Sequence, residues 1–234
     1  MSGHGFTFAD IASANAELAD ASAEDVVTWA VRNVPNLTVA SSLSLEDIAL
    51  SHMVTTIAPT ARVFTIDTGR LHEQTYTTMA NVAEQQSVKF DVLLPDTEAL
   101  STFVETYGIN GFYDSVDARK ACCGARKLAP LKSYLKSFDG WVTGMRRSQA
   151  ASRADVSFVE YDAMNGGMLK INPLAGWERK DAVAYITRHG LKYNPLQDDG
   201  FVSIGCAPCT RAIDEGEHER AGRCLLYTSP SPRD

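Results

Sequence analysis

Four of the five cysteines fall in two close pairs, and they are the side chains of this sequence best suited to chemistry. Cys122 and Cys123 are adjacent, whereas Cys206 and Cys209 enclose an Ala-Pro dipeptide. Thiolates are soft ligands that bind zinc and iron–sulfur clusters, and four of them suit either centre. Adjacent cysteines reach one zinc ion only with strain, while a larger cluster tolerates adjacency better. The spacing therefore favours one shared iron–sulfur centre.

Two other interpretations of the cysteines stay open at this point. Cys206 and Cys209 have the spacing of a reversible disulfide, with Cys122 and Cys123 simply packed as small apolar side chains. A structural zinc site is the other alternative. An odd number of cysteines fits a reducing compartment better than a disulfide framework.

Length and charge limit the remaining choices. A chain of 234 residues with 44% hydrophobic content can bury one substantial core. We expect no membrane span and no leader, because no long apolar run occurs, and we expect a cytoplasmic protein. The net charge of −7 argues against a nucleic-acid partner. Local basic clusters on this acidic chain predict a small anionic ligand.

Alternating apolar segments predict an α/β fold with a parallel twisted sheet and helices on both faces. The expected strands are Leu37–Ala40, Arg62–Ile66, Lys89–Leu94 and Trp141–Gly144. The expected helices are residues 8–33, 45–57, 72–86, 96–106, 124–137 and 178–188. Ligands of such sheets bind beyond the carboxyl ends of the strands.

Polar motifs follow three of the expected strands. After the first strand, Ser41, Ser42, Ser44 and Glu46 precede a helix, where free N–H groups and the helix dipole favour an anion. A plain N-cap, with Ser44 and Asp47 as a capping box, explains this segment equally well. Asp67-Thr68-Gly69-Arg70 follows the second strand and is weak evidence by itself. The run Gly144-Met-Arg146-Arg147 follows the fourth strand, and arginine suits phosphate-like oxyanions.

The motifs together resemble a known family. SSLSLED, IDTGRLH, CCGARKLAPLK, WVTGMRRSQAASR, SIGCAPCTR and HERAGR occur in the order typical of assimilatory sulfonucleotide reductases. The four cysteines place the resemblance in the iron–sulfur branch, which reduces adenosine 5′-phosphosulfate. The resemblance spans residues 37–223 and implies an adenine-nucleotide α-hydrolase-like fold with a C-terminal cluster-binding extension. We expect residues 1–223 to form a single domain, with a helical segment at about 1–36.

The resemblance also implies site residues. The four cysteines would hold a 4Fe-4S cluster, which we expect to act electrostatically and structurally. The segment Ser41–Glu46 would bind phosphate. Further nucleotide contacts would come from Asp67, Thr68, Gly69, Arg70, Gly144, Arg146 and Arg147, and a phosphosulfate clamp from Lys127, Arg153, Arg220 and Arg223. Arg153 is matched across a one-residue gap.

In the family a thiolate attacks the sulfate sulfur to form S-sulfocysteine, and thioredoxin or a similar dithiol then releases sulfite. That thiolate belongs to a Glu-Cys-Gly motif, which this sequence does not contain. Residues 224–234 read CLLYTSPSPRD, which we interpret as a non-native tail, with Cys224 an accidental thiol. We therefore expect the chain as printed to bind its nucleotide but barely turn it over.

Other functions and roles were weighed against this one. The alternatives are a reductase of 3′-phosphoadenosine 5′-phosphosulfate and a non-catalytic metal-bound nucleotide-binding module. An adenylating or tRNA-thiolating enzyme is disfavoured because no SGGxDS loop occurs. His72 and His218 are expected to be hydrogen-bonded structural residues, and Trp177 and Tyr185 to be packing residues. The sequence is compatible with a homo-oligomer but does not indicate one.

Overall fold

A computed structural model describes residues 5–223 and contains one six-stranded sheet. The strand order is β3-β2-β1-β4-β6-β5. The strands are β1 (Leu37–Ala40), β2 (Arg62–Ile66), β3 (Phe90–Leu93), β4 (Gly140–Val142), β5 (Val159–Asp162) and β6 (Met168–Ile171). Strand β1 runs parallel to β2 and β4, and β4 runs parallel to β6. The predicted α/β class with a mostly parallel sheet is confirmed.

The last two strands correct the sequence prediction, which had neither of them. Strand β5 is antiparallel to β6, with Val159 opposite Ile171, so the sheet is mixed rather than wholly parallel. Gly166 and Gly167, at φ values of 82° and 80°, turn the chain between the two strands. Asn15 covers the outer edge of β5, because its side-chain amide donates to the Val159 carbonyl and its amide oxygen accepts from the Val159 N–H.

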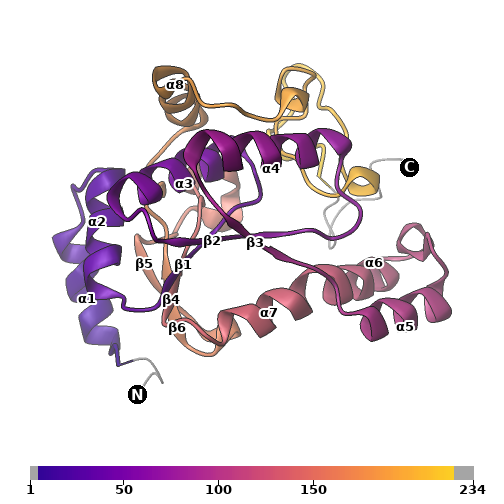
Figure 1. Cartoon of the computed structure of the whole chain (residues 1–234), viewed down its shortest axis with the longest axis horizontal. Helices are drawn as coiled ribbons and strands as arrows, with labels where there is room; N and C mark the ends of the chain where they lie inside the picture. Colours follow the sequence, from indigo (N-terminus) through magenta and orange to yellow (C-terminus); the bar gives the residue numbers. More distant parts are fainter. Residues whose placement is uncertain (1–4, 224–234) are drawn as a thin grey trace. The chain divides into compact units, whose positions relative to one another are not determined.

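Besides short 3₁₀ turns and one π-helical turn, residues 5–223 contain eight α-helices. They are α1 (Phe8–Glu17), α2 (Ala23–Asn33), α3 (Leu45–Ile57), α4 (Glu73–Gln86), α5 (Thr97–Tyr107), α6 (Val116–Cys123), α7 (Ala129–Leu135) and α8 (Arg179–His189). The single helix expected at 8–33 is two helices, because Ser22 begins α2 with a capping box to Asp25. Figure 1 shows these two helices next to each other.

The described chain forms two compact units, neither of them continuous in sequence. Unit 1 contains residues 5–65, 77–91 and 135–194, and unit 2 contains residues 66–76, 92–134 and 195–223. Unit 1 has two apolar clusters. One joins α1 and α2 to β5 and β6, with Val26 and Ile171 fully buried. The other joins α3 and α8 to β1, β2 and β4, with Ile48 and Val142 fully buried.

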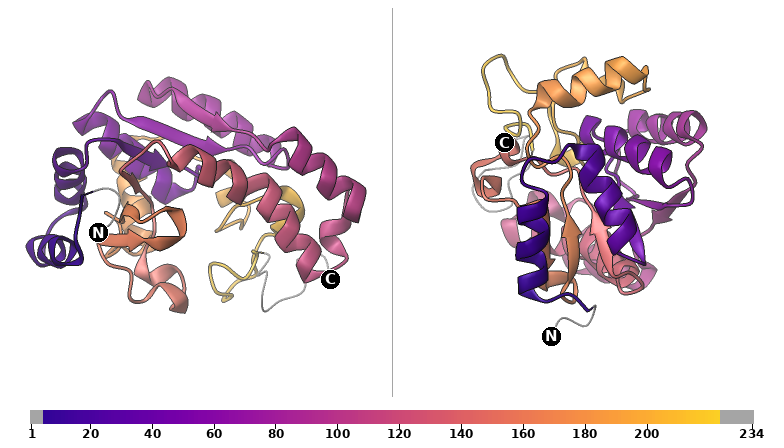
Figure 2. Two further views of the ribbon diagram at one scale, coloured as in Figure 1. Left: turned by 90° about the horizontal axis from the view of Figure 1, so that it is seen from below. Right: turned by 90° about the vertical axis from the view of Figure 1, so that its left-hand side faces the viewer.

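Unit 2 contains a continuous helical rod, which Figures 1 and 2 show as α6 running into α7. A π-helical turn, Gly124–Leu128, joins the two helices. The sequence placed the start of this helix at residue 124, but the rod begins at Val116, where Ser115 caps it by accepting from the Ala118 N–H. Cys122 and Cys123 therefore form the last turn of α6. π turns frequently mark functional sites.

None of the helices formed by residues 5–223 has the length and apolar character needed to cross a bilayer.

Candidate functional site

The segment between β1 and α3 is the anion-binding candidate of unit 1. Ser44 caps α3, with its hydroxyl oxygen accepting from the Asp47 N–H at 3.3 Å. Within residues 5–223, the backbone N–H groups of Ser44, Leu45 and Glu46 have no acceptor. Three consecutive free donors at the start of a 13-residue helix, where the helix dipole is positive, are suited to a phosphate-like oxyanion.

Asp47 fixes the shape of this segment. Its carboxylate accepts from the Ser42 N–H at 2.7 Å and from the Ser42 hydroxyl at 2.5 Å. The expected capping box thus has a different form: Ser44 supplies the cap, and Ser42 makes the return contact with Asp47. Burial raises the pKa of Asp47, although the hydrogen bonds from Ser42 oppose the shift. Because both Ser42 donors are occupied, only rearrangement would free Ser42 for the substrate contact that was predicted.

Leu43 holds a strained backbone conformation in the same segment. Its φ of 60° lies in the left-handed region, which costs a leucine roughly 1–2 kcal/mol. Burial of the Leu43 side chain and a 3.3 Å bond from its N–H to the Ser41 hydroxyl oxygen retain this geometry. Strain of this kind clusters at ligand-binding segments.

A buried ion pair joins this segment to the one after β4. Arg146 donates through Nε to Glu46 Oε1 at 2.8 Å, with both side chains buried. Arg146 also donates to the Ser148 hydroxyl at 2.6 Å. A Cβ atom at Gly144 would overlap the Asp47 carboxylate, so only glycine allows the two segments to approach this closely. The structure thus brings together Glu46, Gly144 and Arg146, and the Glu46 carboxylate and the Arg146 guanidinium pair with each other. Their predicted contacts with a substrate stay a prediction.

The two other arginines of unit 1 that were predicted as site residues also have protein partners. Arg147 donates to the Val156 carbonyl at 2.7 Å and lies over the Phe158 ring. Arg153 donates to the side chain of Gln149. Whether these side chains contact a substrate stays a prediction.

All four paired cysteines lie in unit 2, where they are half-buried and, within residues 5–223, form no disulfide. Cys206 begins the short 3₁₀ turn Ala207–Cys209, and the Cys209 N–H donates to the Cys206 carbonyl at 2.9 Å. Across residues 5–223, no three Cys, His, Asp or Glu side chains converge on a position for a single metal ion. Cys224 and the rest of the interpreted tail, 224–234, lie outside the described residues.

The predicted segment Asp67–Arg70 contacts the turn that holds Cys206 and Cys209 and the π turn that follows Cys122 and Cys123. The Thr68 hydroxyl lies 3.2 Å from Cys206 Sγ, and the Arg70 carbonyl accepts from the Ala207 N–H at 2.8 Å. On the other side, Arg126 of the π turn donates to the Thr68 carbonyl at 2.7 Å. Gly69 has a φ of 67°, and a Cβ atom at this position would lie 3.3 Å from Arg126 Nη1. This segment therefore links the Cys-Cys helix to the Cys-Ala-Pro-Cys turn.

Both charged residues of this segment already have partners within unit 2. The Asp67 carboxylate accepts from the Gly69 N–H and from the Tyr76 hydroxyl. Burial, and to a smaller extent the hydrogen bond to Asp67, raises the pKa of Tyr76 to about 12. The Arg70 guanidinium donates to the Ile109 carbonyl and stacks on Phe112. A nucleotide role for either residue stays a prediction.

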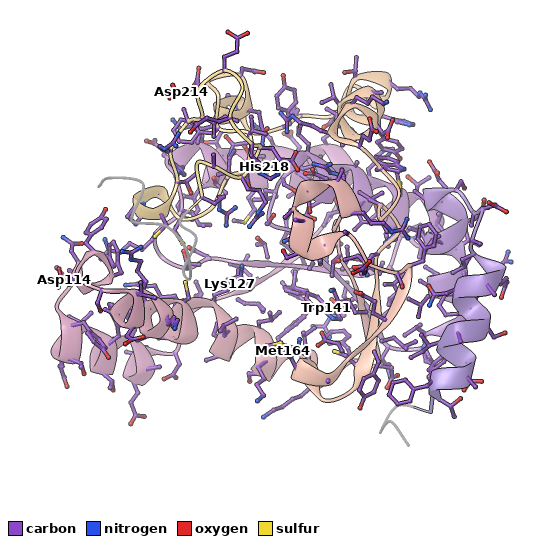
Figure 3. The ribbon with its side chains drawn as sticks, turned by 180° about the vertical axis from the view of Figure 1, so that it is seen from behind. Asp114, Lys127, Trp141, Met164, Asp214 and His218 are labelled. Carbon is purple, nitrogen blue, oxygen red and sulfur yellow. The ribbon has the colours of Figure 1, made fainter. Side chains whose placement is uncertain are left out.

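Cationic groups surround the thiols. Burial raises the pKa of Cys122, while the positive charge of Arg126 opposes the shift. Lys127 projects from the π turn and is labelled in Figure 3. Lys127 is exposed to solvent. The pKa of its ammonium group is nevertheless lowered, first by loss of hydration and second by repulsion from Arg223. A ligand with negative charge would relieve this repulsion.

Arg223 and Arg220, the other predicted clamp residues of unit 2, differ in their contacts. The Arg223 guanidinium donates to the Ile204 carbonyl at 2.6 Å and packs against Gly205, so it also holds the cysteine loop. Arg220 contributes its N–H to His218 Nδ1 at 3.2 Å. His218 is thus hydrogen-bonded, as expected. His72 instead packs edge-on against Phe201, and its buried Nε2 has no partner within residues 5–223.

Three residues near these sites were not assigned a role from sequence. Asp47 was recognised only as half of a capping box, and its buried contact with Ser42 has no sequence signal. Arg126 was noticed only as part of a basic cluster. Thr210 directly follows Cys209, and its hydroxyl donates to the Cys206 carbonyl at 2.9 Å. Adjacency to the cysteine motif is the one signal that could have found it.

The structure defines an α/β protein with a mostly parallel six-stranded sheet and a helix start after β1 whose free N–H groups suit an oxyanion. The phosphoadenosine phosphosulfate reductase domain family matches residues 36–212, and the chain belongs to this family. It is 43% identical over 204 residues to the adenosine 5′-phosphosulfate reductase of Allochromatium vinosum, covering 87% of this chain and 79% of the relative. It is 46% identical over 158 residues to the Rhizobium tropici reductase of the same name, covering 68% and 87%.

Solved structures agree with this assignment. The phosphoadenylyl-sulfate reductase of Candida auris, in a phosphate complex, is similar with a TM-score of 0.76 and 27% identity, over 87% of this chain and 97% of that chain. The FMN adenylyltransferase of Candida glabrata has a TM-score of 0.55 at 12% identity, over 91% and 70%. The second likeness concerns the fold alone.

Proposed function

We propose that the chain is an oxidoreductase that reduces adenosine 5′-phosphosulfate to sulfite and AMP in sulfate assimilation. The observation that carries the proposal is the 43% identity to a relative named for this activity, over 87% of the chain. The free N–H groups at Ser44–Glu46 support it, because a nucleotide phosphosulfate presents the oxyanions that such a helix start binds.

The proposed reaction is a transfer to sulfur. A thiolate attacks the sulfate sulfur, the bond from sulfur to the phosphate oxygen breaks, and AMP leaves with the electron pair. A dithiol such as thioredoxin then supplies two electrons, forming its own disulfide and releasing sulfite. By the resemblance, the attacking thiolate belongs to a Glu-Cys-Gly motif. In the proposal, Lys127 and Arg220 stabilise charge that builds on the phosphosulfate oxygens.

A 4Fe-4S cluster held by Cys122, Cys123, Cys206 and Cys209 is the proposed cofactor. The donor set has suitable chemistry: four half-buried cysteines lie in one unit, and the positive charge of Arg126 opposes the burial that raises the pKa of Cys122. When bound, the cluster would supply a fixed charged group that orders the loop and biases the local electrostatics. Because no three Cys, His, Asp or Glu side chains converge within residues 5–223, the proposed cofactor rests on the resemblance and on the donor chemistry rather than on a preformed ligand group.

Reduction of 3′-phosphoadenosine 5′-phosphosulfate is the second candidate, since the solved relative from Candida auris carries that name. Competition binding separates the two. We expect adenosine 5′-phosphosulfate, which lacks the 3′-phosphate, to bind more tightly by at least about tenfold, or about 1.4 kcal/mol. Equal or reversed affinity contradicts the first assignment.

Two further measurements test the proposal. Iron and acid-labile sulfide should accompany protein purified without oxygen; zinc alone would contradict the cofactor. For turnover, residues 1–223 can be joined to a segment ending in Glu-Cys-Gly. Intact-mass analysis after mixing with adenosine 5′-phosphosulfate should then show a sulfonate adduct on that cysteine, and thioredoxin should release sulfite. A chimera with Glu-Ser-Gly is the matched control.

A further inference from the structure

The Cys-Ala-Pro-Cys turn lies in a C-terminal loop, residues 200–223, that has little regular structure. Its ordered backbone features are the 3₁₀ turn Ala207–Cys209 and an isolated antiparallel bridge between Thr210 and Arg223. Asp214 and His218, labelled in Figure 3, lie on this loop. Irregular loops of this length need side-chain contacts to hold one conformation.

Thr210 bridges two backbone groups at the first cysteine of this turn. Its hydroxyl accepts from the Gly205 N–H at 3.1 Å and donates to the Cys206 carbonyl at 2.9 Å. The residue is buried, so both bonds are shielded from water. Any movement of Thr210 would therefore move the backbone that carries the first thiol of the pair.

The residue after Thr210 anchors the returning chain. The Arg211 N–H donates to the Gly222 carbonyl at 3.0 Å, and a Cβ atom at Gly222 would overlap the Arg211 carbonyl. Only glycine at 222 therefore lets the two strands of the bridge come this close.

The Arg211 side chain joins two parts of the same loop. Its guanidinium makes two parallel hydrogen bonds to the Glu217 carboxylate, at 2.8 and 2.9 Å. Glu217 also accepts from the Asp214 N–H at 2.8 Å. Two-pronged pairs of this kind fix geometry as well as adding energy. The pair is partly exposed, so its effect on global stability is small.

We propose that the Arg211–Glu217 pair is a clasp that positions Cys206 and Cys209 through Thr210, before any metal binds. Both residues are positioning residues, since neither touches the thiols in the structure. This role rests on the proposed function, in which Cys206 and Cys209 are two of the four cluster ligands. Arg211 and Glu217 are not ligands themselves but would hold these two in place.

Thiol alkylation of the full-length, reduced, metal-free chain tests the clasp. Trypsin separates residues 193–211, which hold Cys206 and Cys209, from residues 121–126, which hold Cys122 and Cys123. E217Q should raise the iodoacetamide alkylation rate of the first peptide about threefold to fivefold, leaving the second peptide and the thermal midpoint unchanged. E215Q, an exposed change of the same charge in the same loop, is the matched control.

The charge-reversed double variant R211E/E217R, from which trypsin releases residues 193–217 instead of 193–211, should restore the alkylation rate of Cys206 and Cys209 towards that of the unchanged chain. An unaltered rate in E217Q overturns the proposal, as does equal acceleration of both peptides, which indicates general loosening. Failure of restoration in the double variant also counts against it. Because these measurements need no metal, a negative iron analysis would overturn the proposed cofactor without affecting this result.

Discussion

The hydroxyl of Thr68 lies 3.2 Å from the sulfur of Cys206. Thr68 is the second residue after β2, in a segment predicted from sequence to contact a nucleotide, and its carbonyl accepts from Arg126. One residue thus joins the segment read as nucleotide-binding to both cysteine motifs of unit 2. Changes in the Asp67–Arg70 segment should consequently be detected at the thiols.

Replacing Gly69 by alanine should test this link. Alanine at a φ of 67° costs roughly 1–2 kcal/mol of backbone strain. It would also place a methyl group 3.3 Å from Arg126 Nη1, and so disturb the bond to Thr68. We expect G69A to lower both the free energy of unfolding and the iron content.

Gly190 is the matched control. Its φ of 57° also lies in the left-handed region, but a Cβ atom there meets nothing within 4 Å. G190A should cost similar stability while leaving the iron content unchanged. Equal iron contents in G69A and G190A would show that the contact with Arg126 is dispensable.

A shared metal centre predicts coupled losses in a cysteine variant. C206S should lose the brown visible absorption, the bound iron and part of the thermal stability together, because metal-binding free energy is folding free energy. C224S, which leaves the two pairs intact, should keep all three. A brown and stable C206S protein would contradict a centre that uses all four thiols.

Asp47 predicts an unusual pH dependence. Its folded-state pKa is raised above the unfolded value, chiefly by burial, so its contribution to stability is full at low pH and is lost as pH rises through the folded pKa. D47N removes this ionisation while keeping an oxygen for Ser42. We expect D47N to gain stability relative to the unchanged chain as pH rises, measured by urea unfolding from pH 4 to 8. A constant difference across that range would contradict the raised pKa.

Lys127 and Arg223 should behave differently although both were predicted as clamp residues. K127A should weaken phosphosulfate binding by about 1.5–3 kcal/mol, with a smaller loss for AMP, because a hydrogen bond to a charged group is removed. R223A removes the bond to the Ile204 carbonyl as well, so it should also accelerate alkylation of Cys206. Calorimetry with both nucleotides, together with the alkylation assay, checks this. Accelerated alkylation of Cys206 in K127A would show that Lys127, like Arg223, helps to hold the cysteine loop.

The sequence predicted the parts of the fold that local patterns encode. Strands β1 and β2 were expected with their observed bounds, because short buried apolar runs followed by helical periodicity are typical of parallel sheets. Strand β5, Val159–Asp162, was missed because it is an edge strand with only one buried residue. The Asn-Gly-Gly run after it is a hairpin signal that could have revealed both β5 and β6.

Long-range electrostatics could not be read in the same way. Glu46 and Arg146 form a buried pair across 100 positions of sequence, and no local pattern relates them. Each was predicted to face the substrate, since an isolated charged side chain at a strand end is expected to meet solvent or ligand. The capping of α3 by Ser44 was predictable, but the engagement of Asp47 by Ser42 depends on the left-handed turn at Leu43.

The discontinuous composition of unit 2 sets the order of events during synthesis. Cys122 and Cys123 leave the ribosome long before Cys206 and Cys209, and most of residues 124–205 between the two pairs contribute to unit 1 instead. Contacts this distant in sequence form late in folding. The first pair of thiols must therefore wait until Cys206 and Cys209 have been made. Under the proposed shared centre, loading would follow the synthesis of residue 209, and a reducing environment would protect the first pair until then.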